Sequence, residues 1–317
     1  MPAEAAALSF AILGRPFAAR NVSEPLAAWL REGWEFADQV AAPHPFAIAV
    51  EGAAAAPPDA AVTWTEQEIA VPGRVLRFRN AGPLWRMGDE RAGLRLELGD
   101  TAARLALWGE GRGDVSELRH GLYVALTEAL RASGLVPLHA AVAARDGECV
   151  AWLGASGAGK STTLLYAAAA GWRAIAEDLC WLEPESLRVH GWDRGVRCLP
   201  GTLERLFPGL DASRPGPDGK RVVAYDRLRA AEPRASVLTR LALLRRVAGG
   251  ESHLEPALVR DAVKALWEAT GVPLATRSRD RAATVIGRLG RLPAMRLVVG
   301  DDPPSLTGAW PGQPGEG

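Results

Sequence analysis

One stretch of the sequence, from Val150 to Thr163, constrains the fold of this chain more than any other. It reads VAWLGASGAGKSTT, an apolar run and a glycine-rich turn that lead into a predicted helix over 162–170. The pattern is a complete G-x-x-x-x-G-K-S phosphate loop between a strand and a helix. Glycines at 154, 157 and 159 let successive backbone N–H groups point toward phosphate oxygens at the positive end of the helix. The stretch therefore predicts an α/β domain with a nucleotide site.

The loop supplies a set of candidate binding residues. Lys160 is expected to reach the β and γ phosphates, and the hydroxyl of Ser161 is expected to bind Mg²⁺. The residues predicted to contact nucleotide are Gly154, Ala155, Ser156, Gly157, Ala158, Gly159, Lys160, Ser161 and Thr162.

Two adjacent carboxylates interrupt the next predicted strand. Residues 173–183 read RAIAEDLCWLE, an apolar run that contains Glu177 and Asp178. This strand is the first one after the helix of the loop, and so short a spacing argues against transporter-type and helicase-type ATPases. Neighbouring residues of a strand face opposite sides of a sheet, so the two carboxylates are expected to have unequal roles.

A further strand is predicted immediately upstream of the phosphate loop. Residues 138–144 form an apolar run that turns at 145–147 into the loop strand, so His139 is expected to start a hairpin. A lone histidine is more often structural than functional. Its position in order with the loop and the acidic pair favours a role at the site, in orienting the carboxylates or the acceptor.

The ordered set of LHA at 138–140, GASGAGKS at 154–161 and AED at 176–178 resembles the catalytic domain of HPr kinase/phosphorylase and its shorter relatives. The resemblance covers roughly residues 116–300 and is strongest over 136–184. Where the family usually carries Asp-Asp, this chain has Glu177-Asp178. The long glycine-rich signature of the full-length bacterial enzymes is not apparent. The chain looks more like the short homologues that phosphorylate peptide precursors, including lasso-peptide precursors.

The resemblance implies an α/β fold: a P-loop kinase domain of the HPr-kinase type, with a mixed central sheet and flanking helices, preceded by a strand-rich α+β N-terminal domain. It implies transfer of a phosphoryl group from ATP, with Mg²⁺, to a serine hydroxyl of a peptide or protein. By the family pattern, Ser161 and Asp178 hold the metal and Glu177 takes the proton, although the two acidic roles are interchangeable on this reasoning. Lys160 and His139 complete the predicted catalytic set.

Two other functions are compatible with the same residues. A small-molecule kinase on this scaffold would be favoured if the N-terminal region closed over the nucleotide. A nucleotide-binding regulator without transfer would be indicated by loss of both acidic residues, and both are present.

The composition sets broader limits. The 317 residues are 48% hydrophobic with a formal net charge of zero, so no overall field attracts nucleic acid or an anionic membrane. No run of about 18 apolar residues occurs, and we expect a cytoplasmic protein without a membrane anchor. The three cysteines, Cys149, Cys180 and Cys198, are expected to be buried thiols. Assembly into a homo-oligomer is left open.

The chain is predicted to have three parts: an N-terminal domain over 1–113 that docks the acceptor, a catalytic domain over 114–300, and a disordered tail over 301–317. In the first part we expect a helix at 24–32, a loop at 53–61 and strands at 46–51, 74–79, 93–98 and 102–108. Its arginines at 74, 77, 79, 86 and 95 are expected on an exposed strand face and its tryptophans at 29, 34, 64, 85 and 108 in the core. The alternative is an arginine and tryptophan surface for an extended peptide.

The remaining expectations concern the catalytic part. Helices are predicted at 115–131, 256–269 and 279–290, with a short one ending near Phe207, and strands at 187–191, 237–246 and 295–299. Residues 208–219 read as a mobile loop that either folds over a ligand or forms a plain surface turn.

Overall fold

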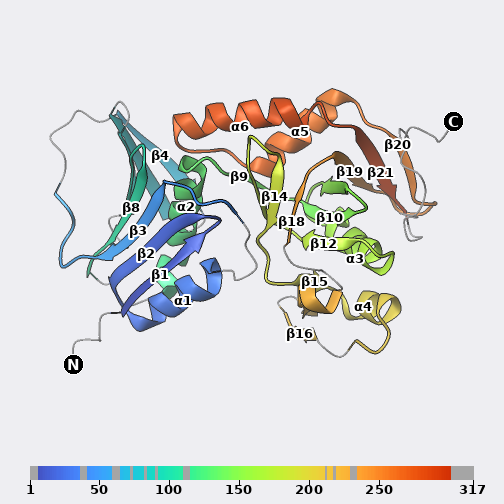
Figure 1. Cartoon of the computed structure of the whole chain (residues 1–317), viewed down its shortest axis with the longest axis horizontal. Helices are drawn as coiled ribbons and strands as arrows, with labels where there is room; N and C mark the ends of the chain where they lie inside the picture. The colour runs from blue at the N-terminus through green and yellow to red at the C-terminus, as the bar shows by residue number, and fades with distance from the viewer. Residues whose placement is uncertain are drawn as a thin grey trace. The chain divides into compact units, whose positions relative to one another are not determined.

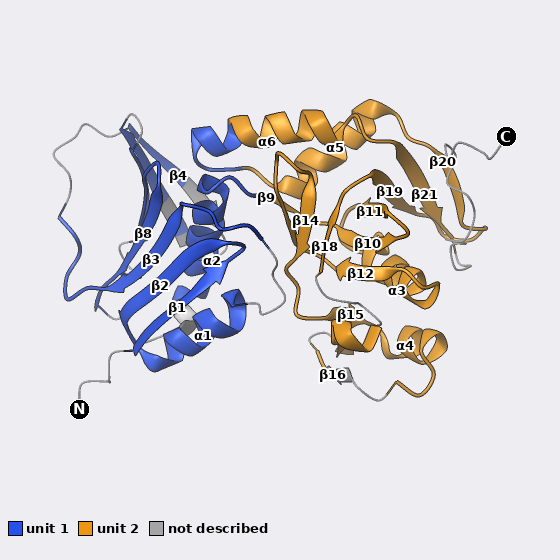
Figure 2. Ribbon diagram, in the orientation of Figure 1, with its two compact units in different colours: residues 1–135, 273–279 blue, residues 136–272, 280–317 orange. Residues whose placement is uncertain are grey.

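The structure is a computed structural model of the chain (Figure 1). It describes residues 6–35, 41–58, 65–71, 74–81, 84–89, 92–109, 115–210, 213–216, 219–228 and 234–300. Within these ranges the protein is mixed α/β, with several sheets and six α-helices. Backbone contacts divide it into two compact units (Figure 2): unit 1 comprises residues 1–135 and 273–279, and unit 2 comprises 136–272 and 280–317.

Unit 1 contains an eight-stranded sheet in the order β1-β2-β3-β8-β7-β6-β5-β4. The helices α1 and α2 contact each other and the sheet, and so cover one of its faces. The elements are β1 (Ala6–Ile12), β2 (Arg15–Val22), α1 (Glu24–Trp34), β3 (Ala47–Gly52), β4 (Thr65–Val71), β5 (Arg74–Ala81), β6 (Leu84–Asp89), β7 (Leu94–Leu98), β8 (Ala102–Leu107) and α2 (Val115–Ala132). The predicted helices at 24–32 and 115–131 and the four predicted strands are confirmed; β1, β2, β4 and β6 were not predicted.

The two faces of this sheet differ because side chains alternate along each strand. One cross-strand row is apolar and buried: Phe78, Met87, Leu96, Leu105, Val50 and Ala19. The row beside it is mostly charged: Glu66, Arg79, Arg86, Glu97 and Arg104. The apolar face is therefore the core of unit 1, and the charged face lies opposite.

Two arginines expected on an exposed face are buried. Arg86 and Arg95 are only 6% and 5% exposed. Arg86 pairs with Glu97 on the next strand, and Arg95 donates to the carbonyl of Pro57 and lies 5.5 Å from the ring centre of Trp108. These partners offset part of the cost of burying the two guanidinium groups. The core assignment of the tryptophans is confirmed for Trp34 and Trp85, whereas Trp29 and Trp108 are half-buried and Trp64 lies outside the described residues.

Unit 2 is built around a six-stranded mixed sheet in the order β12-β10-β11-β19-β21-β20. Two smaller sheets accompany it, in the orders β18-β14-β13-β9 and β15-β17-β16. The elements are β9 (Val136–Leu138), β10 (Ala141–Arg145), β11 (Glu148–Leu153), α3 (Lys160–Ala169), β12 (Arg173–Ala176), β13 (Cys180–Leu182), β14 (Arg188–Gly191), β15 (Val196–Cys198), α4 (Pro200–Leu206), β16 (Ser213–Pro215), β17 (Arg221–Val223), the 3₁₀ helix η3 (Tyr225–Leu228), β18 (Ala235–Val237), β19 (Arg240–Arg246), β20 (His253–Pro256), α5 (Val259–Thr270), α6 (Thr276–Leu289) and β21 (Ala294–Val299).

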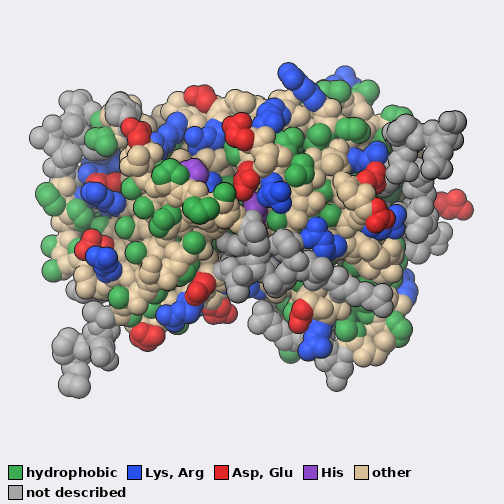
Figure 3. All heavy atoms as spheres, viewed as in Figure 1, with side chains coloured by type: hydrophobic (Ala, Val, Ile, Leu, Met, Phe, Trp, Pro, Cys, Tyr) green, Lys and Arg blue, Asp and Glu red, His purple; other side chains and the backbone are tan. Residues whose placement is uncertain are grey.

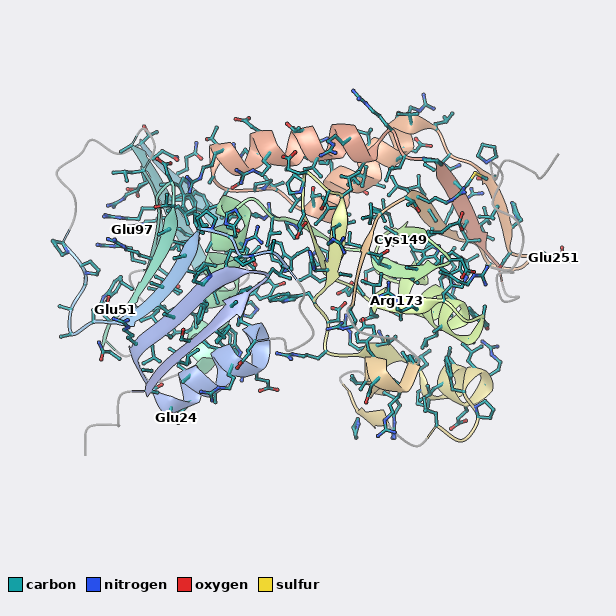
Figure 4. All side chains as sticks on the ribbon, viewed as in Figure 1. Glu24, Glu51, Glu97, Cys149, Arg173 and Glu251 are labelled. Atoms are coloured by element: carbon teal, nitrogen blue, oxygen red, sulfur yellow. The ribbon has the colours of Figure 1, made fainter. Side chains whose placement is uncertain are left out.

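Helices cover both faces of the six-stranded sheet (Figure 1). Along β11, Val150 and Trp152 pack in one core with Leu164 and Leu165 of α3. The intervening residues Cys149, Ala151 and Leu153 pack in a second core with α5 and α6, through Leu266 and Ile286 among others. Figure 4 labels Cys149 on β11 and Arg173 on β12, the two strands that flank β10. Burial on both faces explains why these strands are continuously apolar in sequence.

Three predicted strands are each divided between two sheets. Residues 173–183 form β12 and β13, with a bend at Glu177 and Asp178, because three backbone N–H groups of the bend bond to the Asp193 carboxylate. The predicted strand 138–144 comprises the last residue of β9 and most of β10, with a break at His139. The backbone N–H of His139 donates to the carbonyl of Ala269 instead of to a neighbouring strand. Residues 237–246 leave β18 and enter β19 after a break at 238–239. Apolar composition alone did not reveal these breaks.

The other elements of unit 2 largely follow the expectations. The hairpin of β10 and β11, the helices α4, α5 and α6, and the strands β14 and β21 all form, with ends shifted by up to three residues. The strands β15, β17 and β20 were not predicted. The predicted loop 208–219 contains β16, which pairs with β17 just after the loop, so part of this segment is a β-strand. Residues 301–317 and 59–61 lie outside the described residues.

Charge is mixed on the surface. On the face shown in Figure 3, basic and acidic side chains are interspersed, as the formal net charge of zero leads one to expect. Among the described residues, no helix is both long and apolar enough to span a membrane.

Candidate functional site

The three sequence motifs meet at one edge of the six-stranded sheet. The strand β10 runs antiparallel to both β11 and β12, so the carboxyl ends of β11 and β12 lie at the same edge as the start of β10. The register places Ala141 beside Trp152 and Val142 beside Ala176. The loop after β11, the acidic pair after β12 and His139 before β10 therefore lie at this common edge.

The loop between β11 and α3 has the conformation that its glycines predict. Gly157 and Gly159 have φ values of 80° and 102°, which side chains disfavour. At Gly154 a Cβ atom would lie 3.0 Å from the Cβ of Ala158 and 3.2 Å from the Leu244 carbonyl oxygen. The N–H of Ala158 closes the loop on the carbonyl of Ala155 at 3.1 Å. The loop is thus a compact turn that only glycine permits at these positions.

The helix α3 begins at Lys160, two residues before the predicted start. The first N–H groups of a helix have no partners within it, and they carry its positive partial charge. The side chains of Ala155 and Ser156 and the backbone of Gly157 are exposed at the tip of the loop, and Thr162 is half-buried. The loop and the first turn of α3 therefore offer backbone donors to an anion at the sheet edge.

Lys160 and Ser161 have partners within the protein. The Nζ of Lys160 donates to the carbonyl oxygens of Gly154 at 2.8 Å and Ala155 at 3.3 Å. The hydroxyl of Ser161 donates to Oε1 of Glu177. The predicted loop serine and one predicted acidic residue are thus in direct contact, although sixteen residues separate them in the sequence.

Glu177 and Asp178 differ sharply in exposure. The side chain of Glu177 is 4% exposed, whereas that of Asp178 is 38% exposed. The two carboxylates therefore have unequal environments, but the strand alternation from which unequal roles were predicted does not occur here. The two residues lie in a bend between β12 and β13, so strand alternation does not set their directions.

Asp193 shapes this bend. Its Oδ2 accepts hydrogen bonds from the backbone N–H groups of Glu177 (2.8 Å), Asp178 (2.9 Å) and Leu179 (3.1 Å). Burial raises the pKa of Asp193 to about 6, against the lowering effect of these hydrogen bonds. No motif in the sequence assigns a role to Asp193. The available signal was its position two residues after the predicted strand 187–191 and two residues before Gly195.

Arg197 is the second residue that the sequence analysis missed. Its Nε donates to Oε2 of Glu177 and its Nη2 to Oδ2 of Asp178, both at 3.1 Å. Burial lowers the pKa of Arg197, but the adjacent Glu177 and Asp178 outweigh that effect and raise it. No local pattern identifies this arginine, because nineteen and twenty residues separate it from its partners.

His139 lies at the same sheet edge, between β9 and β10, and its side chain is exposed. Its backbone N–H bonds to the carbonyl of Ala269 at 2.8 Å, which fixes the position of the residue. Within the described part of the chain, the His139 ring has no hydrogen-bond or ion-pair partner. The ring is therefore available to a ligand but is not tied to Glu177 or Asp178.

The residues present fit a magnesium nucleotide. Mg²⁺ in proteins is usually held by one or two carboxylates together with phosphate oxygens and water. The Ser161 hydroxyl and the Glu177 carboxylate are oxygen donors already in contact, next to a loop whose glycines leave room for phosphate. No protein family model matches the chain, and no curated protein matches it either.

Proposed function

We propose that this protein binds ATP with Mg²⁺ at the sheet edge and transfers the γ-phosphoryl group to a serine hydroxyl of a peptide or protein. The fold of unit 2 would then be a P-loop kinase domain of the HPr-kinase type. The observation that carries the proposal is the contact between Ser161 of the phosphate loop and Glu177, with Asp178 beside it. A phosphate loop joined to two carboxylates provides the parts that phosphoryl transfer requires.

The loop and Lys160 hold the polyphosphate in this proposal. Lys160 exchanges the carbonyls of Gly154 and Ala155 for phosphate oxygens, and the backbone N–H groups of the loop and α3 bind the rest of the anion. Bound Mg²⁺ neutralises charge that develops on the phosphate oxygens. Both contributions stabilise the transition state without covalent participation of the protein.

The geometry favours Glu177 for the metal and Asp178 for the base, the reverse of the assignment implied by the family pattern. Glu177 is buried against Ser161, where a metal on the serine hydroxyl would meet its carboxylate. Asp178 is more exposed and so is the carboxylate that an acceptor can reach. Asp178 accepts the proton of the acceptor serine hydroxyl. The serine oxygen forms a bond to the γ phosphorus as the bond between that phosphorus and the β–γ bridging oxygen breaks. ADP is the leaving group.

His139 has a secondary place in the proposal. Its ring is exposed at the same edge, where it can form a hydrogen bond to the acceptor. His139 is not needed to orient the carboxylates, because Asp193 and Arg197 already hold them. We therefore assign His139 to acceptor positioning.

Two measurements on three variants test the proposal: calorimetric titration of ATP with Mg²⁺ for binding, and an assay of phosphoryl transfer for turnover. Lys160→Ala should abolish turnover, because loss of a phosphate-binding charge costs several kcal/mol in the transition state. Glu177→Gln should weaken metal-dependent nucleotide binding, and Asp178→Asn should leave binding intact while transfer falls by about 100-fold or more. An unaltered rate in Lys160→Ala would reject the nucleotide site. The opposite pattern in the two acidic variants would restore the family assignment.

The acceptor class needs its own assay. Lasso-type precursor peptides that contain serine, free sugars and nucleosides are offered to the wild type with labelled ATP. Incorporation into serine of a peptide supports the proposal, whereas efficient labelling of sugars or nucleosides would make the protein a small-molecule kinase. Nucleotide binding without transfer to any acceptor would favour a regulatory protein.

A further inference from the structure

Arg197 binds both acidic residues of the site. One guanidinium group donates from Nε to Glu177 and from Nη2 to Asp178, each at 3.1 Å. Glu177 also accepts the hydroxyl of Ser161 on its other oxygen. The Glu177 carboxylate, which the proposed function assigns to the metal, is therefore already engaged by an arginine and a serine of the same chain.

We propose that Arg197 occupies the carboxylates while the site is without metal, yields them when Mg²⁺ binds with nucleotide, and then pairs with oxygens of the phosphoryl group being transferred. This inference rests on the proposed function. It assigns to Arg197 a catalytic role and, before the metal binds, a role in limiting metal binding.

Mg²⁺ and Arg197 are expected to compete for the carboxylates, because both are positively charged and both need carboxylate oxygens. Mg²⁺ requires carboxylate oxygens at about 2.0–2.1 Å in near-octahedral geometry. The hydrogen bonds of Arg197 use Oε2 of Glu177 and Oδ2 of Asp178. A dication and a guanidinium group beside the same carboxylates also repel each other, strongly so where one carboxylate is buried. A metal beside Ser161 would meet Oε1 of Glu177 while Arg197 bonds to Oε2, so the two cations share one carboxylate and each weakens the binding of the other.

The backbone of Arg197 is anchored, but its side chain has room to move. On either side of it in β15, Val196 and Cys198 are buried in the core that contains α3. The Arg197 side chain is 42% exposed, so it can change rotamer without opening that core. On release it remains next to the edge where the γ phosphate would lie, and a guanidinium group there stabilises transition-state charge.

The strand β15 also links Arg197 to the segment that was predicted to be a loop. Arg197 pairs with Val222 of β17, and Val222 pairs in turn with Arg214 of β16. A ligand-induced shift of this three-stranded sheet would move Arg197 with it. The position of Arg197 therefore depends on how this three-stranded sheet packs.

The proposal is tested with Arg197→Gln, Arg197→Lys and, as control, Arg227→Gln, which removes an arginine that is 60% exposed. The first readout is Mn²⁺ binding to the nucleotide-free protein, followed by electron paramagnetic resonance. Arg197→Gln should bind Mn²⁺ about tenfold more tightly than wild type, because a competing positive charge is gone. Arg197→Lys should bind it with intermediate affinity, and the control should match wild type.

The second readout is the rate of transfer at saturating ATP and Mg²⁺. It should fall by about 100-fold in Arg197→Gln, in spite of the tighter metal binding. Opposite changes in metal affinity and turnover are not expected of a merely structural residue. If Arg197→Gln unfolds, Arg197→Lys provides the Mn²⁺ measurement.

Unchanged Mn²⁺ affinity in these variants would overturn the competition, and an unchanged turnover would overturn the catalytic role. Failure of the proposed function is recognised separately. In that case the wild type itself would bind neither Mn²⁺ at this site nor ATP, and Lys160→Ala would be indistinguishable from it.

Discussion

At the scale of single residues, the site depends on a carboxylate that sequence patterns do not mark. Asp193 accepts three consecutive backbone N–H groups of the bend that carries Glu177 and Asp178. Its backbone carbonyl in turn accepts a hydrogen bond at 2.8 Å from Arg234, which is itself buried. Asp193 thus holds the bend that carries the two candidate carboxylates.

The raised pKa of Asp193 predicts a pH dependence of stability. Burial moves the pKa from its ordinary 3.8 to about 6, so the folded chain binds more protons than the unfolded chain between these values. The contribution of this group to stability is therefore greatest below pH 3.8 and falls as the pH rises to about 6, by up to about 3 kcal/mol. Asp193→Asn should lack this fall, as measured by urea unfolding at a series of pH values.

The control for this prediction is Asp146→Asn, which changes a carboxylate that is 90% exposed. It should retain the wild-type pH profile across the range between the ordinary and the raised pKa of Asp193. Parallel profiles for wild type and Asp193→Asn would contradict the assignment of the raised pKa to Asp193.

At the scale of elements, the decisive feature is the passage of the chain from one sheet to another between β12 and β13. Where the chain makes this passage, the end of β14 approaches β12 closely: Gly191 lies against the backbone of Ile175. A Cβ atom at Gly191 would fall 2.9 Å from the Ile175 carbonyl carbon and closer still to its oxygen, and neither backbone atom can move aside cheaply. Glycine is therefore needed here for packing, next to the acidic bend.

Gly191→Ala is accordingly expected to lower the free energy of unfolding by about 3 kcal/mol or more, because strain in a packed core is relieved only by moving backbone. Gly201→Ala is the matched control: no atom lies within 4 Å of the point that its Cβ would occupy, and the residue is exposed in α4. It should be neutral or slightly stabilising. Equal thermal stability of the two variants would contradict the close approach inferred at Gly191.

At the scale of the whole molecule, the two units do not correspond to two uninterrupted parts of the sequence. The compact unit that contains the eight-stranded sheet includes α2 and residues 273–279. Within it the N–H of Leu274 bonds to the Glu128 carboxylate at 3.2 Å, and Arg277 bonds to the carbonyl of Gly99 at 2.8 Å. Deletion of residues 1–113 would expose the buried face of α2, so point variants are the better test of what unit 1 does.

We propose that unit 1 docks the acceptor peptide at a cavity of about 410 Å³ on the sheet, lined in part by Leu84, Trp85, Arg86, Glu97, Leu98 and Arg104. Arg104 is exposed there and, among the described residues, has no ion-pair partner. Glu97, which is labelled in Figure 4, lies opposite Arg104 but forms its ion pair with Arg86. Arg104 can therefore bind a carboxylate of the peptide. Its apolar neighbours suit an aliphatic side chain of the same segment.

Arg104→Glu should therefore raise the KM for the peptide about tenfold while ATP binding stays unchanged, because a favourable charge contact becomes repulsive. Arg20→Glu reverses an exposed arginine of the same sheet that does not line the cavity, and should leave the KM near wild type. Steady-state kinetics with varied peptide measure both. An unchanged KM in Arg104→Glu would remove the cavity as a docking site.

The sequence by itself determined the local elements whose conformations depend on nearby residues. The phosphate loop, its strand and its helix follow from the positions of three glycines, because φ values of 80° and 102° at Gly157 and Gly159 admit little else. The long helix at 115–132 and the hairpin before the loop follow from apolar spacing and turn residues in the same local way. The order of motifs also identified Glu177, Asp178 and His139 as candidates for one site.

The tertiary structure alone decided how these candidates are held. Arg197 and Asp193 reach the acidic bend only because the chain crosses from one sheet to another, which places residues fourteen to twenty positions apart in contact. Burial of Arg86 likewise depends on its cross-strand neighbour Glu97. An apolar run has the same appearance whether it forms one strand or two, since the backbone partners that divide it come from distant segments. Local sequence therefore specifies the conformation of the loop, and long-range strand pairing specifies which charged side chains surround it.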